Sequence, residues 1–191
     1  MKPLKWTETE KNLLHAFLWE SKARAKYDLF AKQAKKEWLE QISAIFTETA
    51  LNEVQHWKRF FRFLEWNQVD LNVTFWTEQV WDTLENLKEA ASGENEEWSK
   101  LYPDFAKIAE DEWFPQIAQV FKVIAKVEKA HDERFQKLYK NLEDWKVFKS
   151  EDKIIWKCRN CGHLHEWYSA PKVCPACLHP ESYFQIKENN Y

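Results

Sequence analysis

The chain has 191 residues, of which 45% are hydrophobic and 31% charged, so it can bury a core and add a small second domain. Its net charge is −3 and both signs are mixed without a basic block, so we expect no nucleic-acid partner. No apolar run approaches the roughly 18 residues that span a bilayer, and residues 1–10 lack the apolar stretch of a signal peptide. We therefore expect a cytoplasmic protein with no membrane partner.

Residues from about 4 to 145 are predicted to be helical, because Pro and Gly are nearly absent and apolar residues recur at spacings of three and four. The apolar stripes run over residues 13–34, 42–63, 80–101 and 117–142. Residues 65–77 lose this pattern and predict a long crossover. Pro103 is expected to end the third helix and begin a short one through Asp111, and Pro115 suits the first turn of the last helix.

Acidic residues and histidines interrupt the apolar stripes in a repeated order. A lone glutamate in one helix is followed, 33 or 34 residues later, by Glu-x-x-His in the next helix, which places both side chains on one helical face. The order occurs twice, and its members are Glu20, Glu53, His56, Glu94, Glu128 and His131. Two such helical hairpins joined by a long crossover predict a ferritin-like four-helix bundle.

Buried carboxylates that face one another are costly unless cations compensate them. Carboxylates can bridge two metal ions and imidazole suits iron, so this set predicts a dinuclear metal site. A single Glu-x-x-His is usually surface decoration, but two in register with two further glutamates favour the metal. Glu97 lies three residues after Glu94 and is a seventh candidate ligand. Tyr27 and Tyr102 are either hydrogen-bond donors to ligand carboxylates or ordinary core residues.

All four cysteines lie in the C-terminal segment, where the helical period ends and short aromatic runs begin. They form two Cys-x-x-Cys pairs, Cys158 with Cys161 and Cys174 with Cys177, and each pair can supply two thiolates to a tetrahedral ion. Spacing alone leaves both a structural zinc ion and an iron ion open. We place the domain boundary near residue 149, with a bundle over 1–149 and a four-cysteine domain over 150–191.

The combination resembles rubrerythrin, in which a ferritin-like di-iron bundle is fused to a C-terminal rubredoxin-like domain. Pro175, Ala170-Pro171 and the aromatics Trp156 and Phe184 add to the likeness of the four-cysteine domain to rubredoxin. The resemblance implies a mainly α fold with a small β-rich metal domain. It implies two iron ions in the bundle and one iron ion, or zinc, at the cysteines.

The resemblance also implies a peroxidase that reduces hydrogen peroxide with electrons relayed from an upstream donor, either a reductase or a rubredoxin-like protein. It implies a homodimer in which one subunit's four-cysteine domain approaches the other's di-iron site. Glu97 and His56 are the implied catalytic residues, because they exchange as ligands of one iron: Glu97 bound when oxidised, His56 when reduced. Ferritin-like iron storage and a non-catalytic metal-binding scaffold remain the alternatives.

The chain departs from that family in having 2 Gly and 12 Trp. Trp19 precedes the first ligand, and Trp38, Trp66, Trp113 and Trp145 lie near expected helix ends, where the family usually has glycine. A bulky residue with positive φ is strained by about 1–2 kcal/mol. The pattern indicates a redesigned chain that keeps its metal ligands, and we expect the helix-end tryptophans to be partly exposed or to lie at a dimer surface. Leu178 likewise replaces the small residue expected after the second Cys pair.

Overall fold

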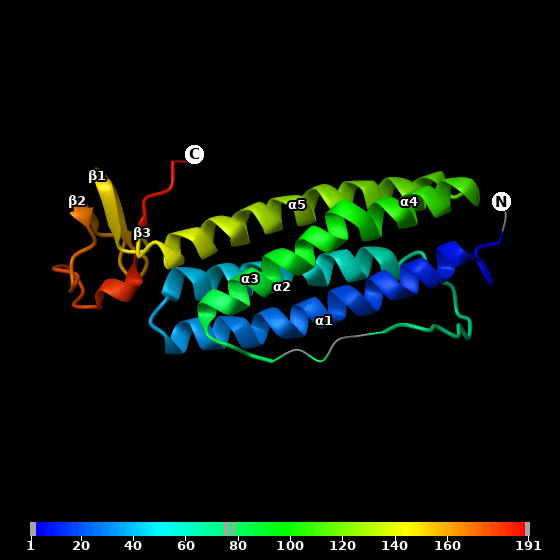
Figure 1. The fold of residues 1–191 in the computed structure, drawn as a ribbon, viewed down its shortest axis with the longest axis horizontal. Helices are drawn as coiled ribbons and strands as arrows, with labels where there is room; N and C mark the ends of the chain where they lie inside the picture. Colours follow the sequence, from blue (N-terminus) through cyan, green and yellow to red (C-terminus); the bar gives the residue numbers. More distant parts are fainter. Residues whose placement is uncertain (1–2, 75–76, 78, 190–191) are drawn as a thin grey trace.

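The computed structural model describes residues 3–74, 77 and 79–189. Helices α1 (Glu8–Lys36) and α2 (Glu40–Phe61) form one antiparallel hairpin. The second hairpin consists of α3 (Thr83–Glu96), the π-helical turn η1 (Glu97–Leu101) and α4 (Tyr102–Asp111), packed against α5 (Pro115–Glu143). Figure 1 shows the two hairpins lying along each other as an elongated bundle, which confirms the predicted fold class.

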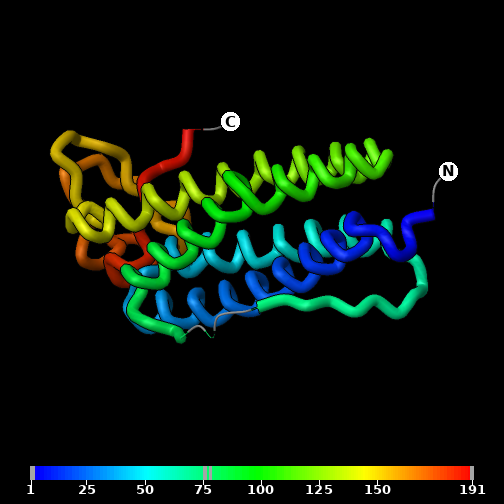
Figure 2. The backbone as a smooth tube through the Cα atoms, turned by 45° about the vertical axis from the view of Figure 1, so that its right-hand side comes forward, coloured from blue at the N-terminus to red at the C-terminus, as the bar shows by residue number. Residues whose placement is uncertain are grey.

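The predicted crossover is present between α2 and α3. Its described residues contain no helix or strand, and in Figure 2 the segment runs back along α1 from one end of the bundle to the other. The third helix begins later than predicted. Asp82 caps α3 by accepting a hydrogen bond from the backbone N–H of Glu85 at 3.0 Å, so Val80 lies before the helix and is exposed.

The short helix predicted from Pro103 through Asp111 is confirmed as α4, but the predicted helix end at Pro103 is wrong, since the chain continues through η1 directly into α4. Proline lacks an N–H and crowds the carbonyl four residues earlier, which would break a regular α-helix. Here a wider turn precedes it, in which the Tyr102 N–H bonds to the Glu97 carbonyl five residues back, and Pro103 falls in the first turn of α4. The helix therefore continues past Pro103 with one extra residue in the turn.

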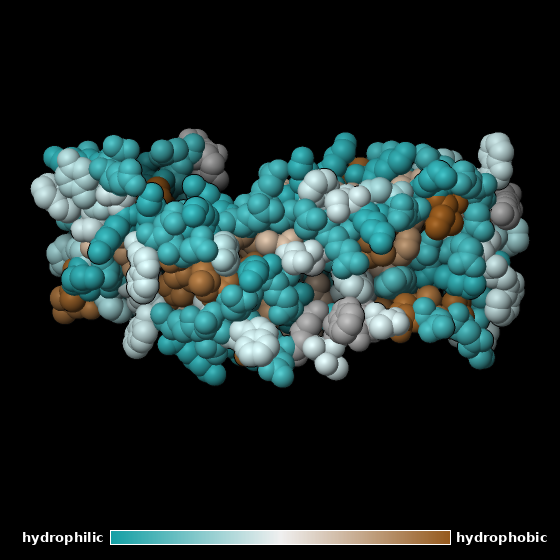
Figure 3. All heavy atoms as spheres, in the orientation of Figure 1, coloured by the Kyte–Doolittle hydropathy of each residue, from teal (hydrophilic) through white to brown (hydrophobic). Residues whose placement is uncertain are grey.

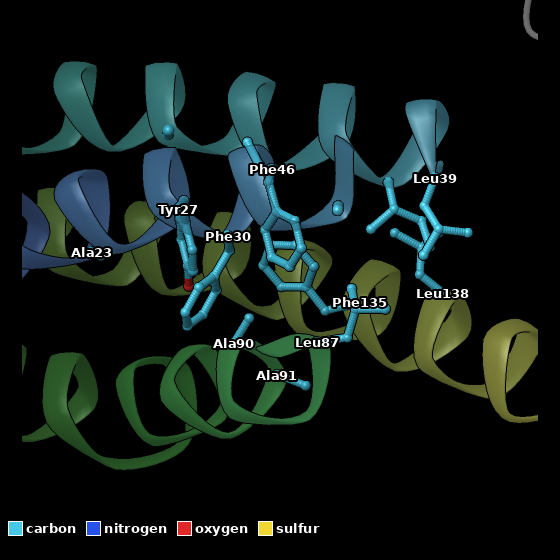
Figure 4. Packing of buried hydrophobic residues seen from close by; sticks show 14 residues of the cluster. Ala23, Tyr27, Phe30, Leu39, Phe46, Leu87, Ala90, Ala91, Phe135 and Leu138 are labelled. Carbon is cyan, nitrogen blue, oxygen red and sulfur yellow. The ribbon is translucent and has the colours of Figure 1, made fainter. Parts of the chain in front are cut away.

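Two buried clusters form the core of the bundle, one toward each end. Figure 4 shows the first, where Tyr27, Phe30, Phe46 and Phe135 meet from three helices. The second cluster lies toward the N-terminal end and contains Phe60, Tyr102, Phe105 and Phe121. The surface of the molecule, seen from one side in Figure 3, is mostly hydrophilic with scattered apolar patches. No helix in the described residues is both long and apolar enough to cross a membrane.

The C-terminal segment forms a three-stranded antiparallel sheet with strand order β2-β1-β3. Its strands are β1 (Lys149–Cys158), β2 (Leu164–Ser169) and β3 (Phe184–Ile186), with the short 3-10 turn η2 (Glu181–Tyr183) before β3. Trp156 and Phe184 are fully buried with Cys158 and Cys174 in a small separate core. This unit sits at the end of the bundle where α5 ends, and β3 and η2 contact α2 (Figure 1).

Three helices, α1, α4 and α5, are each followed by a tryptophan two residues after the helix ends. Trp38, Trp113 and Trp145 have φ of 60°, 69° and 59°, the left-handed region that favours glycine. Each donates its backbone N–H to the carbonyl three residues back. The next residue donates to the carbonyl five residues back, as Leu39 does to Ala34 at 3.0 Å. These side chains are exposed, as is Trp66, which confirms the expectation for the helix-end tryptophans.

Candidate metal centres

Six of the predicted ligands meet in the middle of the bundle, between the two aromatic clusters. Their oxygen and nitrogen atoms form two groups, and within each group all atoms lie within 4.8 Å of one another. The first group is Glu20, Glu53, His56 and Glu128, and the second is Glu53, Glu94, Glu128 and His131. All six side chains are buried, and Glu53 and Glu128 belong to both groups.

The histidine nitrogens point at the shared carboxylates. His56 Nδ1 lies 2.7 Å from Glu53 Oε2 and 2.9 Å from Glu128 Oε1. His131 Nδ1 lies 2.8 Å from Glu128 Oε2 and 3.4 Å from Glu53 Oε1. Despite these distances, both histidine nitrogens and all four oxygens of Glu53 and Glu128 lack a hydrogen-bond partner of acceptable geometry. Buried polar atoms are rarely left without a partner. The unpaired nitrogen and oxygen atoms of this cluster therefore fit a role as ligands of bound cations.

The electrostatics of the groups also fit cations. Burial, and then the neighbouring Glu128 carboxylate, raise the pKa of Glu53 well above its ordinary value. Burial and the Glu20 carboxylate raise the pKa of Glu128 to about 7. Burial alone would lower the pKa of His131, but the adjacent Glu128 and Glu94 carboxylates raise it to about 10. Without metal, protons must therefore supply the positive charge that this cluster needs.

Two tyrosines hold the outer carboxylates. The Tyr27 hydroxyl donates to Glu94 Oε1 at 2.5 Å, and the Tyr102 hydroxyl donates to Glu20 Oε1. Both tyrosines are buried, and burial followed by the facing carboxylate raises each pKa, so both remain protonated donors. Of the two roles considered for these residues, the structure shows the hydrogen-bonded one.

Glu97 is the predicted ligand that the structure keeps apart from both groups. It is buried at the first position of η1, and its Oε1 accepts a hydrogen bond of 2.6 Å from the Trp19 indole Nε1. His56, its predicted competitor, lies within the first group. Burial and the Glu20 carboxylate raise the pKa of Glu97 well above its ordinary value.

Sequence reasoning missed the aromatic residues that close the site at both ends. Phe46 and Phe60 lie seven residues before and after Glu53, and Phe121 and Phe135 lie seven before and after Glu128. Residues seven apart share a helical face, so this spacing could have identified them. The Phe46 and Phe135 rings lie 5.2 Å apart, and the Phe60 and Phe121 rings 5.1 Å apart. These two contacts shield the carboxylates from water along the bundle axis.

The four cysteines meet as predicted. Cys158 Sγ lies 3.7 Å from Cys177 Sγ, and Cys161 Sγ lies 3.7 Å from Cys174 Sγ. A tetrahedron with metal–sulfur bonds of about 2.3 Å has edges of about 3.8 Å, so these separations fit one four-thiolate ion. The two loops are equivalent, because Gly162 donates to the Cys158 carbonyl at 2.8 Å and Leu178 to the Cys174 carbonyl at 2.9 Å. Leu178 adopts φ 60° where Gly162 has φ 78°.

Comparisons with known proteins agree with this architecture. The rubrerythrin family model matches residues 11–139, and the model of its rubredoxin-like domain matches residues 156–185. Rubrerythrin-1 of Clostridium acetobutylicum is 51% identical over all of both chains. Rubrerythrin of Porphyromonas gingivalis is 50% identical over all of this chain and 95% of the relative.

The fold of solved relatives is also similar. A mixed-valence state of nigerythrin has a TM-score of 0.64 at 27% identity, covering 97% of this chain and 89% of the other. A fully reduced, all-ferrous state of nigerythrin has a TM-score of 0.63 with the same coverage. With carboxylate–histidine metal groups in the bundle and a cluster of four cysteines after it, the chain belongs to the rubrerythrin family.

Proposed function

We propose that this protein reduces hydrogen peroxide to water, using two iron ions held in the bundle and a third held by the cysteines. The observation that carries the proposal is that two buried carboxylate–histidine groups share Glu53 and Glu128 in a chain that also has a four-thiolate site. Each peroxide takes two electrons and two protons to give two water molecules. The upstream donor of those electrons is a reductase or a rubredoxin-like protein.

The six clustered residues would together supply the ligands of the two iron ions. Glu20 and His56 would serve one iron, Glu94 and His131 the other, and Glu53 and Glu128 would lie between them. When bound, the iron pair supplies two electrons to one small molecule at one place. Tyr27 and Tyr102 fix the outer carboxylates by hydrogen bonds and keep their own protons.

Access is supported by a pocket of about 240 Å³ between α1 and α3. Trp19, Tyr27 and Glu97 line it, and Lys22 and Lys26 lie in the same wall. The pocket therefore borders both the tyrosine that holds Glu94 and the carboxylate of Glu97. A molecule as small and uncharged as hydrogen peroxide fits this route, whereas the aromatic clusters block both ends of the bundle.

His56 and Glu97 are the proposed catalytic residues, alternating as ligands of one iron with its redox state. A ferric ion gains more from an anionic carboxylate than a ferrous ion does, because the Coulomb energy scales with charge. With iron bound, the arrangement with His56 in the group and Glu97 outside it would be the one expected for the ferrous ion. Crystal structures of the oxidised and reduced iron protein test this, and identical ligands in both would exclude the exchange.

The test of function uses the full chain loaded with iron, a chemical reductant and hydrogen peroxide. Replacing two ligands of the Cys site, Cys158→Ser with Cys174→Ser, should leave the bundle iron in place but lower peroxide turnover at least about tenfold, because electrons lose their entry point. Tyr168→Phe, an exposed change in the same domain, should leave turnover unchanged. Absence of peroxide consumption by the iron-loaded parent chain would refute the proposal.

The alternatives give different results in the same assay. Iron storage shares the bundle but needs no electron entry, so iron would accumulate beyond three ions per chain and the cysteine changes would have no effect. A non-catalytic scaffold would bind three metal ions and consume no peroxide. The four-thiolate geometry favours the peroxidase over storage, because it gives an electron carrier a place in the same chain.

A further inference from the structure

Glu97 is a candidate metal ligand that lies outside both metal groups and is hydrogen-bonded to Trp19. It lies one turn after Glu94, is 3% exposed and belongs to neither of the two groups. The Trp19 indole Nε1 donates to its Oε1 at 2.6 Å. Indole N–H is a donor only, and a bond to a carboxylate is shorter and stronger than a neutral one. The indole N–H is therefore fixed on this oxygen of Glu97.

Trp19 is itself fixed by its neighbours on α1. The His15 ring packs edge-on at 5.9 Å, one turn earlier. Lys22 Nζ lies 5.2 Å from the centre of the indole ring, one turn later. The indole therefore presents its N–H across the gap between α1 and η1, at the wall of the pocket that borders the site.

We propose that Trp19 is a positioning residue that holds the Glu97 carboxylate outside the metal groups and thereby disfavours trivalent ions. The inference rests on the proposed function, because it takes the bundle groups to be metal sites. To bind a metal through Oε1, Glu97 would have to give up the indole hydrogen bond. A hydrogen bond to a charged group corresponds to about tenfold or more in an equilibrium constant.

The direction of the effect follows from charge. An additional carboxylate stabilises a trivalent ion more than a divalent one at the same distance. Holding Glu97 away therefore lowers affinity for trivalent ions more than for divalent ions. In an iron protein the same bias favours the ferrous form with His56 as ligand.

The test measures affinities of the metal-free full chain for Ga³⁺ and Zn²⁺, two redox-inert ions, by chelator competition. Trp19→Phe keeps an aromatic ring and removes the N–H. It should raise the ratio of Ga³⁺ to Zn²⁺ binding constants about tenfold. Trp98→Phe is the matched control, because the Trp98 indole donates to Asp132 at 2.9 Å and Asp132 lies in neither group. That control should leave the ratio unchanged.

Repeating the measurement in a Glu97→Gln chain distinguishes an effect through Glu97 from a nonspecific structural effect of the Trp19 substitution. In Glu97→Gln chains the side chain is neutral, so Trp19→Phe should no longer change the ratio. An unchanged ratio in the parent chain, or an equal rise with Gln at position 97, would overturn the proposal. Failure to bind two ions in the bundle would refute the metal sites as well, whereas two bound ions without a Trp19 effect would refute only the positioning role.

Discussion

At the scale of single residues, the helix-end tryptophans store strain in exposed turns. Trp38 has φ 60° at the position after the α1 cap and is 66% exposed, so its side chain contributes little packing to offset that strain. A left-handed non-glycine residue costs about 1–2 kcal/mol. Trp38→Gly should raise the free energy of unfolding by about 1 kcal/mol and leave metal binding unchanged, as measured by urea denaturation and metal titration.

Trp66→Gly provides the control for this prediction. Trp66 is even more exposed, yet it is not among the residues with positive φ. Glycine there only increases the entropy of the unfolded chain, so stability should stay the same or fall. Equal stabilisation by both changes would show that exposure of the indole, rather than backbone strain, is what matters.

The tyrosine hydroxyls act on the metal groups through the carboxylates that they hold. Tyr27→Phe removes the donor to Glu94 and leaves a buried oxygen without a partner. Loss of such a supporting hydrogen bond typically costs 10–100-fold in metal affinity, so we expect roughly tenfold weaker Zn²⁺ binding in the bundle. Tyr139→Phe is the control, because its hydroxyl bonds to Glu143 on an exposed face. A loss of affinity in both variants would contradict the stated role.

At the scale of the helices, six buried ionisable groups from four helices meet at one level of the bundle. The folded metal-free protein holds protons that the unfolded chain has lost, since the pKa of Glu128 rises from 4.5 to about 7 and that of His131 from 6.5 to about 10. Stability then falls as pH rises through this range, because the unfolded state binds fewer protons.

Metal should reverse this dependence. Bound cations need deprotonated carboxylates and neutral imidazole, so protons compete with metal and stability increases with pH. Urea denaturation followed by helical circular dichroism, between about pH 5 and 8, should give slopes of opposite sign for the metal-free and Zn²⁺-loaded chains. A metal-free protein that becomes more stable on raising the pH would show that these groups are not forced to share protons.

The helices also show what the sequence could and could not predict. Regular spacing of Glu20, Glu53, Glu94 and Glu128 on apolar stripes is a local property, so the bundle and its ligand set were readable. The π-helical turn was not, because Pro103 signals a helix end and only tertiary packing carries the helix past it. Tyr102, the residue directly after this turn, donates a hydrogen bond to Glu20 across the bundle.

Contacts between side chains that are far apart in the sequence could not be predicted either. Trp19 was noticed in the sequence for its unusual place before Glu20, but its bond to Glu97 joins residues 78 positions apart. Periodicity assigns a residue to a face and not to a partner. The sequence therefore identified Glu97 as a candidate ligand without showing that an indole holds it away from the other six.

At the scale of the whole molecule, one aromatic cluster separates the two metal sites. The four-cysteine unit lies at the end of the bundle where α5 ends (Figure 1). Tyr27, Phe46 and Phe135, labelled in Figure 4, each lie on their helix between that end and a carboxylate of the metal groups. Electron delivery from a second subunit would avoid that cluster, so we propose a homodimer. Light scattering should give twice the 23.2 kDa chain mass. A strictly monomeric protein with full peroxide turnover would rule out delivery between subunits.

Every role proposed above requires that the bundle binds two metal ions and the cysteines bind one. An anomalous difference map at the iron edge, from crystals of the iron-loaded full chain, tests this requirement most directly. We expect two peaks about 3.5–4 Å apart between Glu53 and Glu128. A third peak should lie about 2.3 Å from each cysteine sulfur. A single peak in the bundle, or Glu53 and Glu128 turned away from the peaks, would contradict it.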